Sequence, residues 1–198
     1  MSVILGLTGS IGMGKSTTAA MFREAGVPVW DADATVHALY APSGAGVPGI
    51  AALCPEALRD GGIDRGALRD WMSRDPAALR RIESVIHPLA AQSRAAFLAA
   101  HKAAPLVVLD VPLLFETGGD AYCDATLVVS APAEVQRARV LQRPGMTEGH
   151  LDTILSKQMP DSEKRARATH VLETTSLDQA RTQVLALIAQ LTGRRSDA

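Results

Sequence analysis

The chain has 198 residues, of which 47% are hydrophobic and 21% are charged, and its formal net charge is −1. This composition is that of a globular protein and excludes disordered and collagen-like classes, while the length suits one α/β domain with a full core and a small insertion. The near-neutral charge, with no basic block before a short Gly-Arg-Arg run near the end, also argues against a nucleic-acid partner, which would need a basic face.

Membrane and secretory classes are disfavoured as well. No apolar run reaches membrane-spanning length, and the first residues lead directly into an apolar stretch and then glycines, without the pattern of a signal peptide. The two cysteines, Cys54 and Cys123, lie far apart and form no zinc-binding pair, which suits free thiols in a reducing compartment. We therefore expect a cytoplasmic protein with no membrane partner, as a monomer or a weak homo-oligomer.

Short apolar runs bounded by turn residues predict the strands. Val3–Thr8 is rich in β-branched residues and ends at Gly9, and the helix formers from Lys15 to Ala25 stop at Gly26. Because helical segments alternate with such runs, the pattern predicts an α/β fold with a five-stranded parallel sheet flanked by helices. The other predicted strands are Val27–Trp30, Leu106–Asp110, Ala125–Ser130 and one around Val171 and Leu172.

Several segments lie outside this alternation. Residues 42–55 are rich in Gly, Pro and Ala and predict a loop or a weakly helical excursion. Residues 64–102 predict a long helical stretch that is interrupted at Asp75-Pro76 and at His87-Pro88. Residues 137–158 carry basic side chains around a turn at Pro144-Gly145. Ser176 begins a capping-box pattern that opens a final helix to about Leu191, and residues 193–198 are expected to fray.

The run from Gly9 to Ser16, GSIGMGKS, fits the phosphate-loop pattern G-x-x-x-x-G-K-[ST] between a predicted strand and a predicted helix. Glycines let successive backbone N–H groups point at phosphates, and the N-terminus of the helix adds a partial positive charge. In such a loop Lys15 reaches the β- and γ-phosphates, and the Ser16 hydroxyl is a ligand of Mg²⁺. The pattern predicts a nucleoside triphosphate site.

Acidic residues end two of the predicted strands. Ligands of open parallel sheets bind outside the carboxyl ends of the strands, so Asp31 or Asp33 could accept a proton from an attacking hydroxyl or help to hold Mg²⁺. Aspartate is also a favoured N-cap, and one of the two could serve only the helix that follows. Asp110 is placed where an acid acts on Mg²⁺ directly or through water, although it could instead begin a turn before Pro112.

Histidines and arginines outside these motifs carry weaker signals. Taken alone, His37 and His87 fit structural hydrogen-bond partners better than catalysts. Arg65, Arg139 and Arg143 are equally compatible with a solvated surface. Arginine in a segment that can close over a polyphosphate is nevertheless what phosphoryl transfer needs, because negative charge must be stabilised in the transition state.

Four longer pieces follow one another along the chain: LTGSIGMGKST, DADATVH, IDRGAL followed by LRRIESVIHP, and DVPLLFE, with a weaker fifth, RVLQR followed by ILSKQMP. In this order they resemble the dephospho-coenzyme A kinase family over nearly the whole chain. Phosphate loops are common to many families, whereas D-A-D-x-x-x-H and D-V-P-L-L-F-E are specific. The resemblance implies transfer of the ATP γ-phosphoryl group to the ribose 3′-hydroxyl of dephospho-coenzyme A, the last step of coenzyme A synthesis.

The resemblance also implies a role for each candidate residue. Asp33, the second Asp of D-A-D, would be the catalytic base that orients the 3′-hydroxyl, and Lys15 and Arg139 would complete the catalytic set. His37, Arg65, His87 and Glu116 would border the acceptor, dephospho-coenzyme A. Mg²⁺ would be held by Ser16 and Asp110, and ATP would be held by Gly12, Met13, Gly14, Lys15, Ser16, Thr17 and Arg143.

The resemblance further implies one P-loop kinase unit over residues 1–198. Its parts would be a nucleotide-binding core at 1–40, 103–136 and 160–192, a helical acceptor-binding region at 41–102, and a lid at 137–159. The chain departs from the family at Ser10 and Met13, where only backbone N–H groups are used. It also departs at Thr169 and Thr174, where the family usually has Asp and Asn, which bears on the adenine end of ATP.

Two other classes share part of the pattern. Shikimate kinase also places D-x-D after a phosphate loop, but its acceptor is a compact carboxylate, and the long 64–102 stretch with PLLFE favours a larger acceptor. A nucleotide-operated switch that binds a protein partner would need an N-K-x-D guanine motif on a late strand, which the sequence lacks. We therefore expect a small-molecule kinase.

Overall fold

The computed structural model describes residues 2–193, so most of the tail that is expected to fray lies outside the described residues. Contacts between Cα atoms divide the chain into two compact units. The first, which we call the core unit, contains the residues up to Trp30 and those from His101 onward. The second, the helical unit, is the continuous stretch Asp31–Ala100. The division into a core, an acceptor region and a lid stays a prediction about function.

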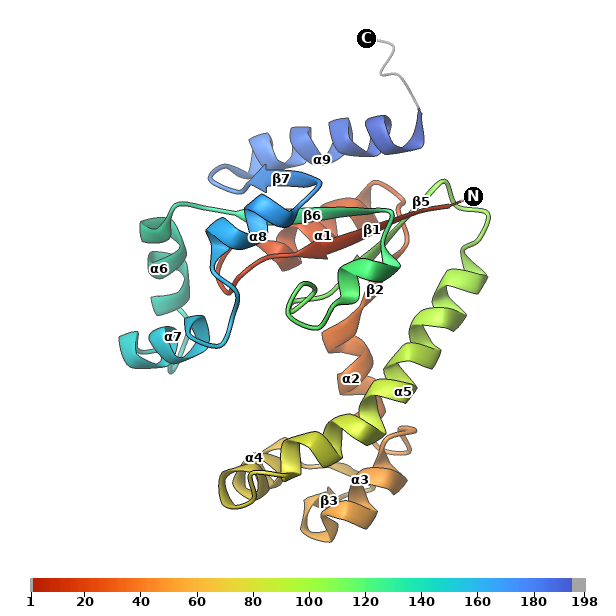
Figure 1. Cartoon of the computed structure of the whole chain (residues 1–198), viewed down its shortest axis with the longest axis vertical. Helices are drawn as coiled ribbons and strands as arrows, with labels where there is room; N and C mark the ends of the chain where they lie inside the picture. The colour runs from red at the N-terminus through yellow and green to blue at the C-terminus, as the bar shows by residue number, and fades with distance from the viewer. Residues whose placement is uncertain (1, 194–198) are drawn as a thin grey trace. The chain divides into compact units, whose positions relative to one another are not determined.

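A five-stranded sheet organises the core unit (Figure 1), and this confirms the predicted fold class. Its strand order is β2-β5-β1-β6-β7, and β1 pairs in parallel with β5 and β6, as β6 does with β7. Crossover connections are required because parallel strands cannot be joined by a hairpin. The strands are β1 (Val3–Thr8), β2 (Val29–Asp31), β5 (Leu106–Asp110), β6 (Ala125–Ser130) and β7 (His170–Glu173).

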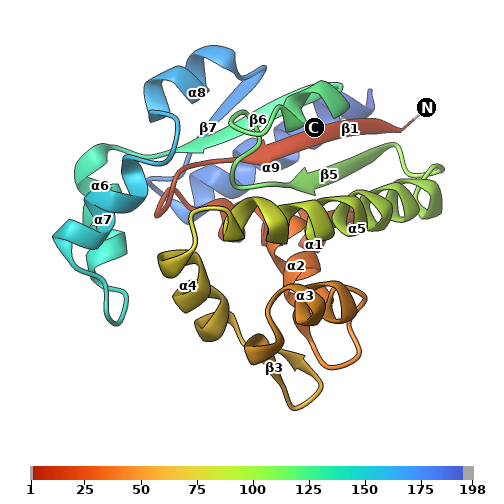
Figure 2. The same cartoon turned by 60° about the horizontal axis from the view of Figure 1, so that its bottom comes forward.

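Helices α1 (Lys15–Glu24) and α9 (Leu177–Thr192) pack on each other and on one face of this sheet, as Figures 1 and 2 show. Alternate residues of β1 point to this face, and Leu5 and Leu7 are fully buried in the resulting cluster with Phe22. Helix α9 begins at the predicted cap, where the Ser176 hydroxyl accepts a hydrogen bond from the Gln179 N–H. The main core therefore packs against the carboxyl-terminal half of β1.

The opposite face of β1 is covered closely by the segment that follows β5. A β-carbon at Gly6 would lie 2.7 Å from the Cys123 sulfur and 2.8 Å from a Leu114 methyl group. Glycine is therefore required at this position, because no side chain fits between the strand and the segment. That segment ends in the short helix η2 (Gly119–Tyr122).

The segment predicted to be a lid contains most of α6 (Ala133–Leu141) and all of α7 (Glu148–Leu155), and α8 (Asp161–Arg167) follows it. Helix α6 packs against α7, and α8 packs on β6. The predicted turn at Pro144-Gly145 lies between α6 and α7, and Gly145 has the positive φ of 75° that glycine tolerates.

The helical unit has a hydrophobic core of its own, which includes Ile50, Leu68, Ile82 and Ile86. The 42–55 stretch contains a true helix, and a two-stranded hairpin that the sequence pattern did not predict follows it. The elements are α2 (Ala32–Tyr40), α3 (Val47–Leu53), η1 (Pro55–Ala57), β3 (Leu58–Arg59), β4 (Gly62–Ile63), α4 (Arg65–Arg74) and α5 (Ala78–Ala100).

One of the two predicted helix interruptions is correct and the other is wrong. Helix α4 ends before Asp75-Pro76, where the Asp75 carboxylate accepts a hydrogen bond from the Ala77 N–H at 2.8 Å. Helix α5 instead continues through Pro88. Proline in a helix removes one hydrogen bond and crowds the preceding turn, at a cost of about 3 kcal/mol. Burial of Ile82 and Ile86 on the turns just before Pro88 offsets this cost.

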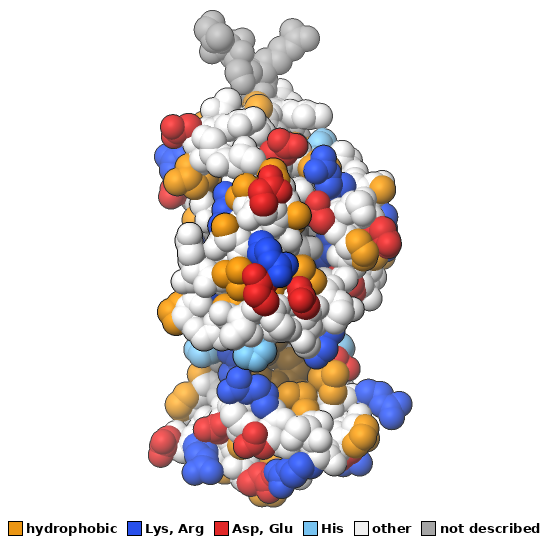
Figure 3. Space-filling view, turned by 90° about the vertical axis from the view of Figure 1, so that its left-hand side faces the viewer, with side chains coloured by type: hydrophobic (Ala, Val, Ile, Leu, Met, Phe, Trp, Pro, Cys, Tyr) orange, Lys and Arg blue, Asp and Glu red, His pale blue; other side chains and the backbone are white. Residues whose placement is uncertain are grey.

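The surface carries charges of both signs. On the face drawn in Figure 3, acidic and basic side chains are interspersed, with hydrophobic groups between them. Within residues 2–193 no helix combines the length and the apolar character needed to cross a membrane.

Candidate active site

The phosphate loop connects β1 to α1 in a conformation that only glycine adopts easily. Gly12 and Gly14 have φ angles of 77° and 90°, in the left-handed region. Gly14 is the N-cap of α1, and no side chain caps that end of the helix. The first N–H groups of α1 are therefore available to an anionic ligand, and the helix dipole favours negative charge there.

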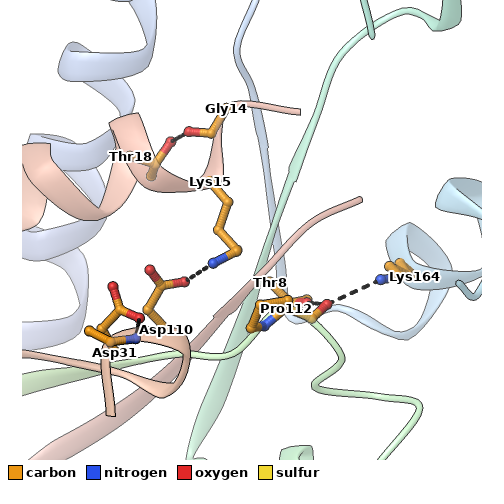
Figure 4. A network of polar contacts seen from close by, with 9 residues as sticks. Thr8, Gly14, Lys15, Thr18, Asp31, Asp110, Pro112 and Lys164 are labelled. Carbon is orange, nitrogen blue, oxygen red and sulfur yellow. Dashed lines mark hydrogen bonds and ion pairs between the residues drawn. The ribbon is translucent and has the colours of Figure 1, made fainter. Parts of the chain in front are cut away.

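Lys15 and Asp110 form an ion pair at the centre of this site. The Lys15 ammonium lies 2.7 Å from a carboxylate oxygen of Asp110, whose side chain is only 2% exposed (Figure 4). The neighbouring Thr8 hydroxyl donates a hydrogen bond of 2.9 Å to the Pro112 carbonyl, which holds the residues after Asp110 against the end of β1. The strand-end position predicted for Asp110 is thus correct, and it brings an acid next to the phosphate-loop lysine.

The two aspartates of D-A-D differ in their local structure. Asp31 is the N-cap of α2, and its carboxylate accepts a hydrogen bond of 2.9 Å from the Ala34 N–H. Asp33 lies in the first turn of the same helix, and its side chain is exposed. The alternative in which one of the two aspartates caps the helix is therefore confirmed for Asp31.

A pocket of about 230 Å³ lies beside the phosphate loop. It brings together loop residues and the two arginines predicted to lie in the lid, Arg139 and Arg143. Thr174, one of the residues at which the chain departs from the family pattern, is also part of its wall. The lining residues are Gly12, Gly14, Thr17, Thr18, Met21, Arg139, Arg143, Thr174, Ser176, Leu177 and Ala180.

The buried Thr174 hydroxyl connects Arg139 to the phosphate loop. It donates a hydrogen bond of 2.8 Å to the Met13 carbonyl and accepts one of 3.1 Å from the Arg139 guanidinium. Arg139 also donates to the Thr174 carbonyl. The sequence indicated Thr174 only as an unusual residue, because nothing in the local pattern shows which distant groups a threonine reaches.

Glu116 forms a partly buried ion pair with Lys164, a residue that the motifs did not indicate. The two charged groups lie 2.9 Å apart, and Lys164 is fully buried. Glu116 also accepts a hydrogen bond of 2.9 Å from the Met159 N–H. Burial raises the pKa of Glu116, but the hydrogen bonds from Lys164 and Met159 outweigh burial and lower this pKa overall. Glu116 is thus fixed within the core unit.

The helical unit contains two pockets of its own. His37 and Arg65 line one of about 290 Å³, and Arg65 also lines a second of about 560 Å³ together with Tyr40 and Arg69. Burial raises the pKa of Tyr40 and nearby Arg65 lowers it by less, so this pKa is raised overall. The structure therefore brings His37 and Arg65 together. His87 is exposed on α5 and is not among the residues that line these pockets.

These features define a phosphate-loop nucleotide-binding protein: a parallel sheet, a glycine loop leading into an uncapped helix, and a lysine paired with a strand-end acid. Comparison with known proteins identifies the particular branch, because residues 3–179 match the dephospho-CoA kinase family. The chain belongs to the dephospho-CoA kinase family. It is accordingly an ATP-dependent kinase that phosphorylates dephospho-CoA.

One curated relative agrees with this assignment, and two solved structures share the fold. The chain is 63% identical over 187 residues to a dephospho-CoA kinase of Cereibacter sphaeroides, covering 94% of each sequence. It is 40% identical to the crystal structure of TT1252 from Thermus thermophilus, with a TM-score of 0.81 over 94% of this chain and 98% of that one. Dephospho-CoA kinase from Campylobacter jejuni shares the fold, with 22% identity, a TM-score of 0.74 and 98% of each chain covered.

Proposed function

We propose a division of roles for the transfer of the ATP γ-phosphoryl group to the ribose 3′-hydroxyl of dephospho-CoA, the last step of coenzyme A synthesis. The Lys15–Asp110 pair at the carboxyl end of the sheet is the observation that carries this proposal. Backbone N–H groups from Gly12 to Thr17 bind the phosphates of ATP. Lys15 then exchanges its contact with Asp110 for the β- and γ-phosphate oxygens, where its charge stabilises the transferring group.

Mg²⁺ is proposed to bind through Ser16 and Asp110. A hydroxyl and a carboxylate are oxygen donors of the kind that Mg²⁺ prefers, and Ser16 is exposed in the first turn of α1. No group of three or more His, Cys, Asp or Glu side chains within residues 2–193 is arranged to hold a metal. Phosphate oxygens and water would supply the remaining ligands, as is usual for Mg²⁺ in kinases. Mg²⁺ held by these residues would neutralise part of the negative charge on the phosphates.

Asp33 is proposed as the base that orients and deprotonates the 3′-hydroxyl. Its exposed carboxylate in the first turn of α2 is available to a substrate, whereas Asp31 uses its carboxylate to cap that helix. The base must lie within hydrogen-bond reach of the attacking hydroxyl when both substrates are bound.

Arg139 and Arg143 are proposed to act from the lid, residues 137–159. Both line the pocket beside the phosphate loop, so a small movement brings positive charge to the triphosphate. The Thr174 contact holds Arg139 near the loop in the meantime. Thr174 and the remaining pocket wall would then face the adenine end of ATP.

Residues 41–102 are proposed to bind dephospho-CoA. His37 and Arg65 share one pocket, and arginine suits the phosphates of this acceptor. His87 is proposed to contribute from α5. Glu116 has one carboxylate oxygen, Oε2, that is buried and has no hydrogen-bond partner within the described residues. Any contribution of Glu116 to the acceptor would use this oxygen, since Oε1 is held by Lys164 and Met159.

The cellular setting follows from the reaction and from the chain itself. We infer that the enzyme acts in the cytoplasm, where ATP is available and where a free thiol such as that of Cys54 persists. We also infer a monomer or a weak homo-oligomer, because a single chain supplies the phosphate loop, its lysine and the adjoining pocket.

Exchange of each aspartate for asparagine tests the assignment of the base. Asp33→Asn keeps the shape but removes the charge, so turnover should fall by about 10²–10⁴-fold while ATP affinity changes little. Asp31→Asn is a matched control, because Asn is as good an N-cap as Asp. The measurement is coupled ADP release with saturating dephospho-CoA. Full activity in Asp33→Asn together with loss of activity in Asp31→Asn would assign the base to Asp31 instead.

The same assay separates the rival acceptors. Wild-type enzyme is compared with dephospho-CoA, shikimate and adenosine as alternative acceptors, and ADP release should depend on dephospho-CoA. Release that is independent of any small acceptor would indicate a nucleotide-operated switch.

A further inference from the structure

Two glutamines hold the backbone of one residue, Ile11, at the start of the phosphate loop. The Gln136 side-chain amide donates a hydrogen bond of 2.8 Å to the Ile11 carbonyl. The Ile11 N–H donates one of 3.2 Å to the Gln158 side-chain oxygen. Ile11 immediately precedes Gly12, where the proposed phosphate-binding N–H groups begin. The two glutamines therefore fix the residue from which that row of donors starts.

The two glutamines come from opposite ends of one segment. Gln136 lies in α6, and Gln158 follows α7, so residues 137–157 connect them. The approach of α6 to the loop is close, because a β-carbon at Gly12 would lie 2.5 Å from a Val140 methyl group and 3.0 Å from the Gln136 carbonyl oxygen. Gln136 is only 7% exposed. Its contact with the loop is therefore a packed, built feature and not a passing surface contact.

Backbone hydrogen bonds of Gln158 and of the next residue hold Gln158 in place. The next residue, Met159, donates its N–H to the Glu116 carboxylate, which the buried Lys164 ammonium also binds. The backbone N–H of Gln158 donates to the Leu155 carbonyl at 3.1 Å. Lys164 therefore supports Gln158 through Glu116 and Met159.

We propose that Gln136 and Gln158 are positioning residues for phosphoryl transfer: by holding the C=O and the N–H of Ile11, they clamp this residue and aim the N–H groups of the phosphate loop at ATP. Neither side chain needs to touch the reacting atoms. A misplacement of about 1 Å at a reacting centre can reduce the rate by about 10²-fold, so a loosened loop should lower turnover. The clamp does not depend on Asp33 or on Mg²⁺, and its hydrogen bonds join residues of this chain alone, so it goes beyond the roles proposed above.

The clamp has a polarity that a charge change can test. Gln136 must be a donor, since it faces a carbonyl, and Gln158 must be an acceptor, since it faces an N–H. Gln158→Glu keeps the required acceptor. Gln136→Glu removes the required donor and places a carboxylate against a carbonyl oxygen. Both variants add the same negative charge next to the same loop, so their difference reports on the hydrogen bond and not on the charge.

The experiment compares these two variants with Gln136→Met and Gln158→Met, which keep side-chain length and remove the polar group. Steady-state kinetics with ATP and dephospho-CoA should show kcat lowered by about 10- to 100-fold in both methionine variants. The KM for dephospho-CoA should stay within about twofold, because the loop binds the donor. Gln158→Glu should have a higher kcat than Gln158→Met, because it keeps the acceptor. Gln136→Glu should have a kcat no higher than that of Gln136→Met, because it lacks the donor. Gln142→Met, the same change at an exposed position of the same segment, is the control and should leave kcat unchanged.

Circular dichroism and thermal unfolding of each variant identify the folded fraction, to which the rates are normalised. If Gln136→Glu fails to fold because a charge is buried, the comparison of Gln158→Glu with Gln158→Met still decides. Wild-type kcat in folded methionine variants, or a Gln158→Glu that is no more active than Gln158→Met, would overturn the proposal. Loss of thermal stability with unchanged kcat would overturn it as well, because the glutamines would then serve only folding.

Discussion

Lys164 is an ammonium group with no exposed surface, and its partner Glu116 is 18% exposed. A buried charge that loses its partner is costly, so Glu116→Leu alone should reduce the free energy of unfolding by about 3 kcal/mol, and Lys164→Met alone is the second single variant. The double variant Glu116→Leu with Lys164→Met should lose much less, because it leaves no unpaired charge. Urea unfolding of the wild type, both single variants and the double variant gives the coupling energy. Additive losses in the cycle would show that the pair contributes no coupling.

The pH dependence of stability provides a control for the same pair. The pKa of Glu116 is lowered in the folded protein relative to its ordinary value of 4.5. The ionised form is therefore favoured by folding, and its stabilising contribution is complete above that value and lost as the pH falls through the folded pKa. The stability difference between wild type and Glu116→Gln should be constant near neutral pH and should shrink below about pH 4.5. A stability difference that grows on acidification would contradict the lowered pKa of Glu116 in the folded protein.

Local motifs could be predicted from the sequence where one short stretch contains all the necessary groups. Gly12, Gly14 and Lys15 are of this kind, because the loop makes its own geometry. The spacing in the sequence does not show whether Asp31 or Asp33 is the catalytic base. In the structure the Asp31 carboxylate caps α2 through a hydrogen bond, which favours Asp33 as the base. Lys164 could not be predicted, since its partner is distant in sequence and only the tertiary fold brings the two together.

The segment predicted to be a lid, residues 137–159, contains α7 and most of α6. If residues 137–159 close over ATP only when both substrates are bound, cleavage in the exposed turn around Pro144-Gly145 should slow in the ternary complex. Limited digestion by thermolysin, with a non-hydrolysable ATP analogue and dephospho-CoA present together and separately, measures the rate by fragment mass. We expect slow cleavage only with both ligands. Equal cleavage rates in all samples would show that α6 and α7 do not close when the substrates bind.

Whole elements could be predicted when their signals were continuous. The strands Val3–Thr8, Leu106–Asp110 and Ala125–Ser130 have the predicted bounds, because buried parallel strands appear as unbroken apolar runs. The hairpin β3–β4 was missed because two-residue strands leave no periodic pattern. The predicted interruption at Pro88 is wrong, because α5 continues through it. Proline disfavours a helix interior, but tertiary packing overrides this local preference.

The division into two units predicts that each substrate slows hydrogen exchange in a different part of the chain. ATP analogue alone should slow hydrogen exchange in the core unit, and exchange in residues 31–100 should slow only when dephospho-CoA is added. At a ligand concentration of about 100 times Kd, amides that exchange by complete unfolding of the bound unit should slow by about 100-fold. Exchange detected by mass spectrometry on peptides from each unit measures this. Equal protection of residues 31–100 by the ATP analogue alone would show that the two units unfold as one.

The central place of β1 has a consequence for how the chain emerges from the ribosome. Both strands that flank β1 are made much later, since they begin at Leu106 and Ala125. At about 5–20 residues per second, the nascent β1 waits on the order of ten seconds for its neighbours. Residues 31–100 are continuous and carry their own core, so they can fold during this delay. The phosphate loop is therefore among the first parts of the chain to be translated and among the last to reach its final geometry.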